Sequence, residues 1–468
     1  MVKSGCKNAK LFFAEPLLGK VISSPFLCIP GNIFRKFEQI MFQDEYDIAV
    51  IGAGPAGLMA AIESHESSRK ILILEKMHNP ALKLRISGKG RCNITNDAEL
   101  KDFISHFGKN GRFLKYAFSE FCNTDLLKYF KKLGVQFKLE RGGRYFTQND
   151  NAMNVAKALL DKARSLKILL STNSEVMGIT RPSKGKFTLT VNKKNPAGNR
   201  NTQRIQINTD KIVLATGGKS YPRTGSSGGG YKLSSQLGHT ITPLSPSLVP
   251  VETRGDSAKR LQGLSLKHVK AEVWCKNKKV DERFGEMLFT DSGLSGPIIL
   301  SLSKTIVNLI NDKQKVVISI DLKPALDHKR VDQRLLREID EHSKQGFKRL
   351  LGRLLPAKLV PLFAEKLNIP EEKRLNQITS EERKRLKLLL KDFQFEVTGY
   401  RSFDNAIVTC GGVCIKEIDP QTMESRLVKG LYFAGELIDI DADTGGFNLQ
   451  AAFSTGWIAG RATRFSSQ

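Results

Sequence analysis

A glycine-rich loop between a strand-like and a helix-like segment constrains this chain more than any other feature. Residues 47–51 form an apolar run that is typical of a buried parallel strand. Residues 58–68 predict a helix, and residues 71–74 predict a second strand that ends at Glu75. This is a βαβ unit of about 30 residues. Its first turn contains the six loop residues Gly52, Ala53, Gly54, Pro55, Ala56 and Gly57.

The spacing of the three glycines predicts a site for a dinucleotide cofactor. Gly52 permits a tight turn, Gly54 lets the backbone approach a pyrophosphate, and Gly57 lets the helix pack on the strand. The free N–H groups at the helix N-terminus would bind the phosphates. Glu75, followed by Lys76, is placed to accept hydrogen bonds from the adenosine ribose. The loop alone does not distinguish NAD from FAD.

Two later segments favour FAD. Residues 430–436 predict a buried strand that ends in glycine and acid, and a helix is expected from about 449 to 463. The N-terminus of that helix would stabilise negative charge on a reduced flavin. Residues 212–215 predict a further core strand, whose end would lie near the adenine. The expected FAD contacts in these segments are Thr216, Gly217, Gly218, Gly435, Glu436, Asp439, Gly445, Gly446, Phe447, Asn448, Leu449 and Gln450.

The pattern of elements predicts an α/β fold in which a Rossmann-like FAD-binding domain is split in sequence. Residues 111–140 and 152–164 predict helices, and residues 168–214 predict strands. A β-barrel insertion and a small helical insertion interrupt the domain. The expected parts are an N-terminal extension (1–43), the FAD-binding domain (44–242 and 411–468), the β-rich insertion (243–322 and 392–410) and the helical insertion (323–391).

The first 43 residues have six basic and two acidic side chains and no small-residue cleavage site, which argues against a secretory signal. Either translation starts at Met41, or this segment targets an organelle. The best candidate for a membrane span, residues 11–34, is interrupted by charges and prolines. The seven cysteines form no disulfide pattern, which fits a reducing compartment. We therefore expect a cytoplasmic protein without a membrane partner.

Several further motifs carry a resemblance to a known family. They are residues 86–96 (Ile-Ser-Gly-Lys-Gly-Arg-Cys-Asn-Ile-Thr-Asn), 216–222, 225–226, 285–290, 293–297, 423–425 and 430–450. On these motifs the chain resembles the BaiN/RdsA family of NAD(P)/FAD-dependent oxidoreductases over residues 45–465. The sequence departs from the family pattern at Gly229, Ala442 and Asp443. The resemblance implies FAD as cofactor and NAD(P)H as the reductant, with Gly88, Gly90, Arg91, Cys92 and Asn93 near the cofactor.

The resemblance implies two substrate classes, a uridine of large-subunit ribosomal RNA or an unsaturated steroid-like molecule. Either reaction reduces a conjugated carbon–carbon double bond. The chain has 74 Lys and Arg against 47 Asp and Glu, a net charge of +27, which favours a polyanionic partner. Residues 323–391 carry 18 basic and 10 acidic side chains, and residues 183–204 carry six basic and none acidic. The charge therefore favours ribosomal RNA, and a non-catalytic flavin-carrying ribosome factor is a further alternative.

Reduction of uridine requires a general acid as well as a flavin. Cys92 is the first candidate, because Arg91 beside it would lower its pKa or orient it. Tyr221 is the second candidate. Packing around the cofactor is the alternative role for Cys92, and helix capping is the alternative for Asn448 and Gln450. The histidines show no metal-ligand spacing and no Ser/His/Asp set stands out, so we expect no metal.

Overall fold

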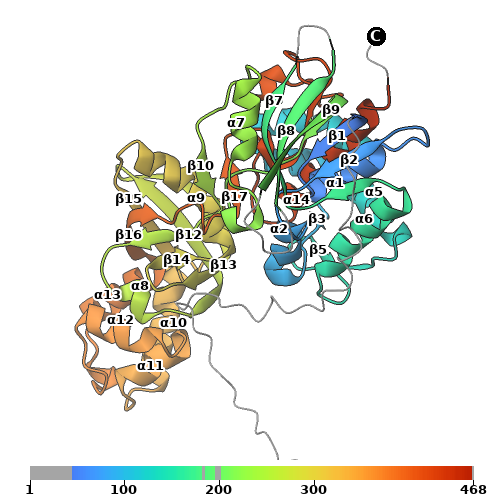
Figure 1. Ribbon diagram of the computed structural model, residues 1–468. Helices are drawn as coiled ribbons and strands as arrows, with labels where there is room; N and C mark the ends of the chain where they lie inside the picture. Colours follow the sequence, from blue (N-terminus) through green and yellow to red (C-terminus); the bar gives the residue numbers. More distant parts are fainter. Residues whose placement is uncertain (1–44, 182–184, 195–201, 466–468) are drawn as a thin grey trace, which may run out of the picture.

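The computed structural model describes residues 45–181, 185–194 and 202–465 (Figure 1). The predicted N-terminal extension and part of the basic segment 183–204 lie outside these residues. The fold has two parts, a large α/β domain and a barrel that carries a helical cluster at its far end.

The centre of the α/β domain is a seven-stranded sheet. Five of its strands pair in parallel, and two further strands extend the sheet through antiparallel pairs. All four residues of the second strand are buried, as expected for a parallel strand covered on both faces. The order is β6 (Leu169–Ser171), β2 (Ile71–Leu74), β1 (Glu45–Ile51), β9 (Thr202–Leu214), β8 (Phe187–Lys194) and β7 (Ser174–Thr180), with β18 (Leu431–Phe433) beside β9.

Helices α1 (Pro55–Glu63) and α14 (Phe447–Ala462) pack closely against each other, although they come from opposite ends of the chain. A Cβ atom at Gly456 would lie 2.4 Å from the carbonyl oxygen of Ala56, so only glycine permits this approach. The predicted helix over 58–68 ends earlier, at Glu63, because the Ser64 hydroxyl bonds back to Ala60 O and the chain turns toward β2. The remaining helices here are α2 (Leu82–Ile86), α3 (Leu100–Ser105), α4 (Lys115–Glu120), α5 (Asn123–Lys132), α6 (Met153–Ser165) and α7 (Gly229–Gln236).

A small antiparallel sheet lies beside this domain, formed by β3 (Thr95–Asn96), β5 (Arg144–Thr147) and β4 (Phe137–Glu140). The prediction of helices through residue 140 is wrong at its end, since β4 pairs with β5 there. A second, two-stranded sheet of β10 (Ser245–Ser247) and β17 (Val408–Cys410) connects the α/β domain to the barrel.

The barrel is closed by six antiparallel strands around a core that includes Val273, Met287, Phe289 and Ile318. It confirms the predicted β-barrel insertion. The strands, in order, are β11 (Val251–Thr253), β14 (Gly293–Ser295), β13 (Lys278–Phe289), β12 (Ser265–Cys275), β15 (Val316–Asp321) and β16 (Phe393–Tyr400). Two helices that were not predicted also belong here, α8 (Ser257–Arg260) and α9 (Pro297–Asn311).

The helical insertion occurs between β15 and β16, at the end of the barrel away from the sheet (Figure 1). Its apolar residues join the barrel core, with Phe347 and Phe363 fully buried. The predicted Rossmann-like fold class with both insertions is confirmed, whereas the domain boundaries stay a prediction. No helix in the described ranges is long and apolar enough to cross a membrane. The insertion consists of α10 (His328–Glu341), α11 (Phe347–Leu354), α12 (Leu359–Leu367) and α13 (Ser380–Lys391).

Candidate cofactor site

A cavity of about 860 Å³ lies at the carboxyl ends of β1, β2, β9 and β18. This edge of a parallel sheet is where α/β proteins bind ligands. The first turns of α1, α7 and α14 line it, so three helix N-termini present free N–H groups to one space. The predicted cofactor residues that line the cavity are Gly52, Ala53, Gly54, Pro55, Ala56, Glu75, Lys76, Gly88, Thr216, Gly217, Gly435, Glu436, Asn448 and Leu449.

The glycine loop closes one side of the cavity. Gly52 has φ +104°, and a Cβ atom there would lie 2.5 Å from Ala215 O. At Gly57 a Cβ atom would lie 1.9 Å from Gly52 O, so this glycine is required for the helix to pack against the strand. A Cβ atom at Gly54, in contrast, would meet no heavy atom within 4 Å. Gly54 therefore leaves open space beside the N-terminus of α1, where a phosphate group can approach the backbone.

Glu75 is held rigidly at the end of β2. Its Oε2 accepts a hydrogen bond from Ala53 N at 2.8 Å, and its Oε1 accepts one from Met77 N at 2.8 Å. Burial raises the pKa of Glu75, which these backbone hydrogen bonds partly oppose. Each carboxylate oxygen can accept a second hydrogen bond. The side chain therefore lies where it can accept hydrogen bonds from hydroxyl groups of a ribose, and this contact stays a prediction.

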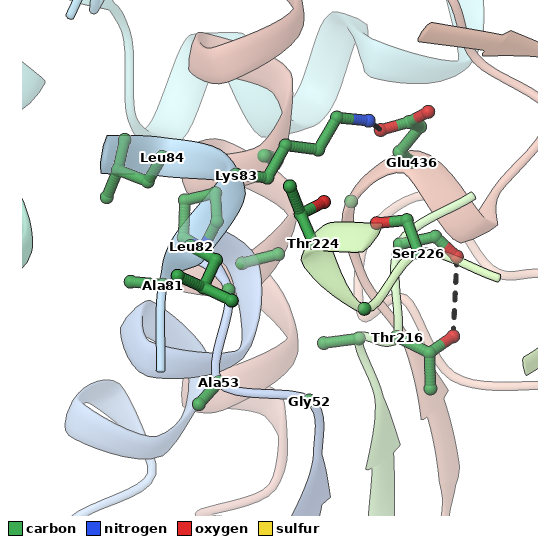
Figure 2. A pocket seen from close by; sticks show the side chains of 18 of the residues that line it. Gly52, Ala53, Ala81, Leu82, Lys83, Leu84, Thr216, Thr224, Ser226 and Glu436 are labelled. Carbon is green, nitrogen blue, oxygen red and sulfur yellow. Dashed lines mark hydrogen bonds and ion pairs between the residues drawn. The ribbon is translucent and has the colours of Figure 1, made fainter. Parts of the chain in front are cut away.

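An ion pair that was not predicted joins α2 to the segment after β18 in the wall of the cavity (Figure 2). Lys83 Nζ lies 2.6 Å from Glu436 Oε2 and donates to Ser220 Oγ at 2.7 Å. Glu436 Oε1 accepts from Ser220 Oγ at 2.7 Å and from Thr409 N at 2.9 Å. Glu436 was predicted as a cofactor residue. The only sequence signal for Lys83 was its position just before the motif at 86–96.

The motif at 86–96 lines the cavity with its first four residues, Ile86, Ser87, Gly88 and Lys89. Its other predicted cofactor residues lie outside the cavity lining. Arg91 forms ion pairs with Glu140 and Asp150, and its guanidinium lies 4.1 Å from the ring centroid of Phe146. Arg91 therefore holds the small sheet and does not face the cavity. The left-handed backbone at Lys89, with φ +59°, turns the chain away. Gly90 and Asn93 also lie outside the cavity lining, with the Asn93 amide against Gly446 N and Thr95 O.

The prediction that Arg91 lowers the pKa of Cys92 is wrong. Cys92 is completely buried, and burial raises the pKa of its thiol to about 12. Its side chain does not line the cavity. A buried, protonated thiol in this place packs beside Ser87, which corresponds to the alternative role of Cys92 in cofactor-shell packing.

Several predicted residues of the C-terminal segment support the cavity from outside. Gln450 is buried and bonds to Thr95 Oγ1 at 2.7 Å, to Ser454 Oγ at 3.0 Å and to Phe121 O at 3.2 Å. Gln450 lies outside the cavity lining and its amide bonds to interior groups, so the structure gives no support to the predicted contact with the flavin ring. The other predicted residues outside the lining are Gly57, Gly218, Asp439, Gly445, Gly446 and Phe447.

Contact with the flavin ring stays a prediction for Asn448, which does not cap α14 through a side-chain hydrogen bond. Its Oδ1 accepts from Ala442 N and its Nδ2 donates to Ala442 O, both at 2.9 Å. This pair of bonds fixes the loop that precedes α14. The residue also lines the cavity, next to Leu449.

Of the two predicted acids, only Tyr221 lines the cavity. Its backbone is left-handed, with φ +50°, and is held by Tyr221 N donating to Phe403 O and Thr224 N donating to Tyr221 O. Burial raises the pKa of the phenol, so it stays protonated at neutral pH. Tyr221 can therefore act as a proton donor toward a group bound in the cavity.

A Ser–His–Glu arrangement that the sequence did not reveal lies away from the cavity. His239 Nε2 is 2.9 Å from Ser425 Oγ, and His239 Nδ1 is 3.2 Å from Glu417 Oε2. Ser425 Oγ also accepts from the backbone N–H groups of Leu427 and Val428. Because the histidine side chain is inaccessible and the serine is buried, this set ties α7 to the C-terminal segment and has no room for a substrate. In the described part of the chain, no group of three or more His, Cys, Asp or Glu side chains could hold a metal ion.

These features fit FAD. The open glycine loop and three helix N-termini suit a pyrophosphate, and Glu75 suits the adenosine ribose. Among the other residues that line the cavity, Lys83 supplies a cation, Glu436 a carboxylate and Tyr221 a phenol.

Comparison with known proteins identifies the family of this chain. The model of the HI0933-like protein Rossmann domain matches residues 46–462. A "3-dehydro-bile acid delta(4,6)-reductase" of Clostridium scindens is 30% identical over 89% of this chain and 98% of its own length. A "Ribosomal RNA dihydrouridine synthase" of Escherichia coli is 30% identical over 88% of this chain and 97% of its own. Its counterpart of the same name in Haemophilus influenzae is also 30% identical, over 87% and 96%.

A solved structure shares the fold at low identity. The 3-ketosteroid delta1-dehydrogenase of Sterolibacterium denitrificans is 11% identical, with a TM-score of 0.51, over 90% of this chain and all of that one. The chain belongs to the HI0933-like family, which its BaiN/RdsA-type motifs indicated, and it is an FAD-dependent oxidoreductase.

Proposed function

We propose that this protein reduces a conjugated carbon–carbon double bond, and that its substrate is a uridine of large-subunit ribosomal RNA, converted to dihydrouridine with NAD(P)H as the reductant. Two relatives that align over almost their full length bear the name ribosomal RNA dihydrouridine synthase. Such a substrate also agrees with a cytoplasmic location.

The observation that carries the RNA assignment is the net charge of +27. Charge of this size favours a polyanion and is not needed to hold a small substrate. Much of it is solvent-exposed. In the described part of the chain, the exposed side chains Arg330, Arg337, Arg349 and Arg385 of the helical insertion have no ion-pair partner.

The residues around the cavity have separate roles in this proposal. The glycine loop and Glu75 hold the adenosine diphosphate half of FAD, and Lys83 with Glu436 fixes the opposite wall. When bound, FAD supplies a hydride to one carbon of the uracil 5,6 double bond. Tyr221 donates the proton to the other carbon, since its raised pKa keeps the phenol protonated.

A small-molecule reductase is the second candidate, because the relative named as a bile-acid reductase is as similar as the two named as RNA-modifying enzymes. A flavin-carrying ribosome factor without activity is the third.

Dihydrouridine mapping of ribosomal RNA from cells with and without the gene tests the proposal. We expect one site to lose the modification in the deletion strain and to regain it when the wild-type gene is returned. Ribosomal RNA that is unchanged by the deletion would overturn the RNA substrate. Flavin that is reduced by NAD(P)H but not reoxidised by RNA or by an unsaturated steroid would favour the non-catalytic factor.

A further inference from the structure

Three side chains from two parts of the molecule lie together on the surface and are called the stack: Arg141 lies over His268, and Phe284 makes a tilted ring contact with His268. Arg141 lies in the turn between β4 and β5, His268 lies in β12, and Phe284 lies in β13. Arg141 Nη1 is 3.4 Å from His268 Nε2, and Arg141 Nη2 is 3.2 Å from His268 Nδ1. The two nitrogens of an imidazole ring point in different directions within the ring plane, so one guanidinium in that plane could not approach both. The two distances therefore place the guanidinium of Arg141 over the face of the His268 ring. The His268 and Phe284 ring centroids are 6.3 Å apart, at an interplanar angle of 39°.

The stack is held open to solvent by the backbone. His268 has φ +56°, which is uncommon for a residue with a side chain. It occurs where the pairing of β12 with β13 shifts register between Leu266 and Val269. A bulge of this kind redirects a side chain, and such bulges are frequent next to active sites. Phe284 is 59% exposed, although burial of a phenyl ring is favourable. Among the residues that the structure describes, the stack therefore presents a largely exposed aromatic surface.

Basic side chains adjoin the stack, and Glu282 and Glu286 lie two residues to either side of Phe284 in β13. Arg141, His268 and the neighbouring exposed Lys267 form no ion pair with any carboxylate in the described ranges. An exposed phenyl ring beside a stacked guanidinium and a free lysine has the chemistry of a site for a nucleic-acid base and its phosphate. An apolar protein partner would be disfavoured, because the charges of Arg141 and Lys267 would have to be desolvated without partners.

The stack lies beside the loop that leads into the cofactor cavity. Asn96 Nδ2 donates to Gly142 O at 3.1 Å and to Gly445 O at 3.0 Å, which joins the turn of Arg141 to this loop. On the barrel side, Arg283 Nη2 lies 4.0 Å from Asp443 Oδ2 of the same loop. The loop continues into the first turn of α14, which lines the cavity. The helical insertion is at the opposite end of the barrel (Figure 1).

We propose that Arg141, His268 and Phe284 bind single-stranded RNA immediately next to the target uridine. Phe284 stacks on a base that neighbours the uridine, and Arg141 and Lys267 bind the phosphates. Enzymes that act on a base in structured RNA must extrude it, and the unstacked neighbours then need new partners. This inference rests on the proposed RNA substrate.

The test uses the FAD-loaded protein and large-subunit ribosomal RNA purified from cells that lack the gene. Phe284→Ala is compared with Val280→Ala, which removes another exposed apolar side chain (49% exposed) from the same strand. For Phe284→Ala we expect RNA binding about tenfold or more weaker and less dihydrouridine, the size of effect that loss of one base–aromatic stack produces. Phe284→Trp should restore binding, and Val280→Ala should bind as the wild type does.

Two measurements separate folding from binding. FAD absorbance and the rate of flavin reduction by NAD(P)H should be unchanged in all variants. Arg141→Gln should also lower the salt dependence of RNA binding by about one counterion. If wild type forms dihydrouridine while Phe284→Ala binds and modifies RNA equally well, the stack is not the RNA site and the inference is overturned. If wild type neither binds nor modifies this RNA, the proposed function itself is overturned.

Discussion

Lys83 Nζ lies 2.6 Å from Glu436 Oε2, and this ion pair joins two residues that are 353 positions apart in the chain. Ser220 and the backbone of Thr409 bind the same carboxylate. Four distant segments therefore meet at one acidic group in the wall of the cofactor cavity. The two side chains of the pair are 24% and 19% exposed, so water screens them only in part.

Replacement of Lys83 by Met should destabilise the protein even without FAD. The change removes two hydrogen bonds that the charged ammonium of Lys83 donates, one to the Ser220 hydroxyl and one to the Glu436 carboxylate, which should lower the free energy of unfolding by about 1–3 kcal/mol. Urea unfolding of the apoprotein measures this effect. Lys89→Met is the matched control, since Lys89 lines the same cavity and is exposed. Equal stability of the two variants would show that the ion pair contributes nothing.

Two glycines of the cofactor loop should respond in opposite ways to alanine. Gly57→Ala should prevent folding, because its Cβ would lie 1.9 Å from Gly52 O. Gly54→Ala should leave the apoprotein as stable as wild type, since no atom lies within 4 Å of the added Cβ and the backbone is extended. It should nevertheless weaken FAD binding by filling the space for the phosphate, which a titration of apoprotein with FAD measures. Unchanged FAD affinity in Gly54→Ala would place the pyrophosphate elsewhere.

The thiol of Cys92 should be chemically inert in the native protein. It is buried, and its pKa of about 12 leaves almost no thiolate at pH 8. Mass spectrometry after alkylation at pH 8 should find Cys92 unmodified in the folded protein and modified after unfolding in urea. Rapid native alkylation of Cys92 would restore it as a candidate acid.

Tyr221→Phe should lose the proton donor and keep the cofactor. We expect the rate of substrate reduction to fall by about 10²–10⁴-fold, the usual contribution of a general acid. FAD affinity and flavin reduction by NAD(P)H should not change, and Cys92→Ala should keep most of the activity. A Tyr221→Phe protein with wild-type turnover would remove this residue from the chemistry.

His239 should make the fold sensitive to mild acid. Burial lowers the pKa of His239 below its ordinary value of 6.5, so the folded protein keeps the ring neutral while the unfolded chain takes up a proton. Stability from this group is complete above pH 6.5 and is lost as the pH falls below it, by up to about 1.4 kcal/mol per pH unit. Urea unfolding at pH 7.5 and 5.5 should show a smaller loss in His239→Gln than in wild type. Equal losses would contradict a neutral buried ring.

Local patterns in the sequence predicted much of the fold. The strand at 71–74 and the glycine loop were correctly predicted, because strand periodicity and turn glycines act over a few residues. Alpha-helix α9 was missed because its apolar residues Ile298, Leu302 and Ile306 occur in a segment bounded by strands and turn residues. Its helical spacing was present in the sequence, and the surrounding strand pattern masked it.

Side-chain direction could not be predicted in the same way. The left-handed backbone at Lys89 and Cys92 directs Arg91 toward Glu140 and Asp150. The amino-acid sequence of this segment does not show that these two residues adopt left-handed dihedral angles. The contact of His239 with Ser425 spans 186 residues and depends on how α7 packs. Composition could indicate a polyanionic partner, but the stack of Arg141, His268 and Phe284 became visible only when two separate parts of the chain were placed together.

The packing of α14 on α1 has a consequence for how the protein is made. The strand β18 and the first turn of α14 complete a cavity whose opposite side comes from residues 51–56. During translation the glycine loop leaves the ribosome early. Nearly 400 further residues, up to Leu449, must be synthesised before the cofactor cavity is complete. FAD can therefore be captured only after synthesis is almost complete. A premature stop anywhere before α14 should yield a chain without cofactor, exposed to quality-control proteases.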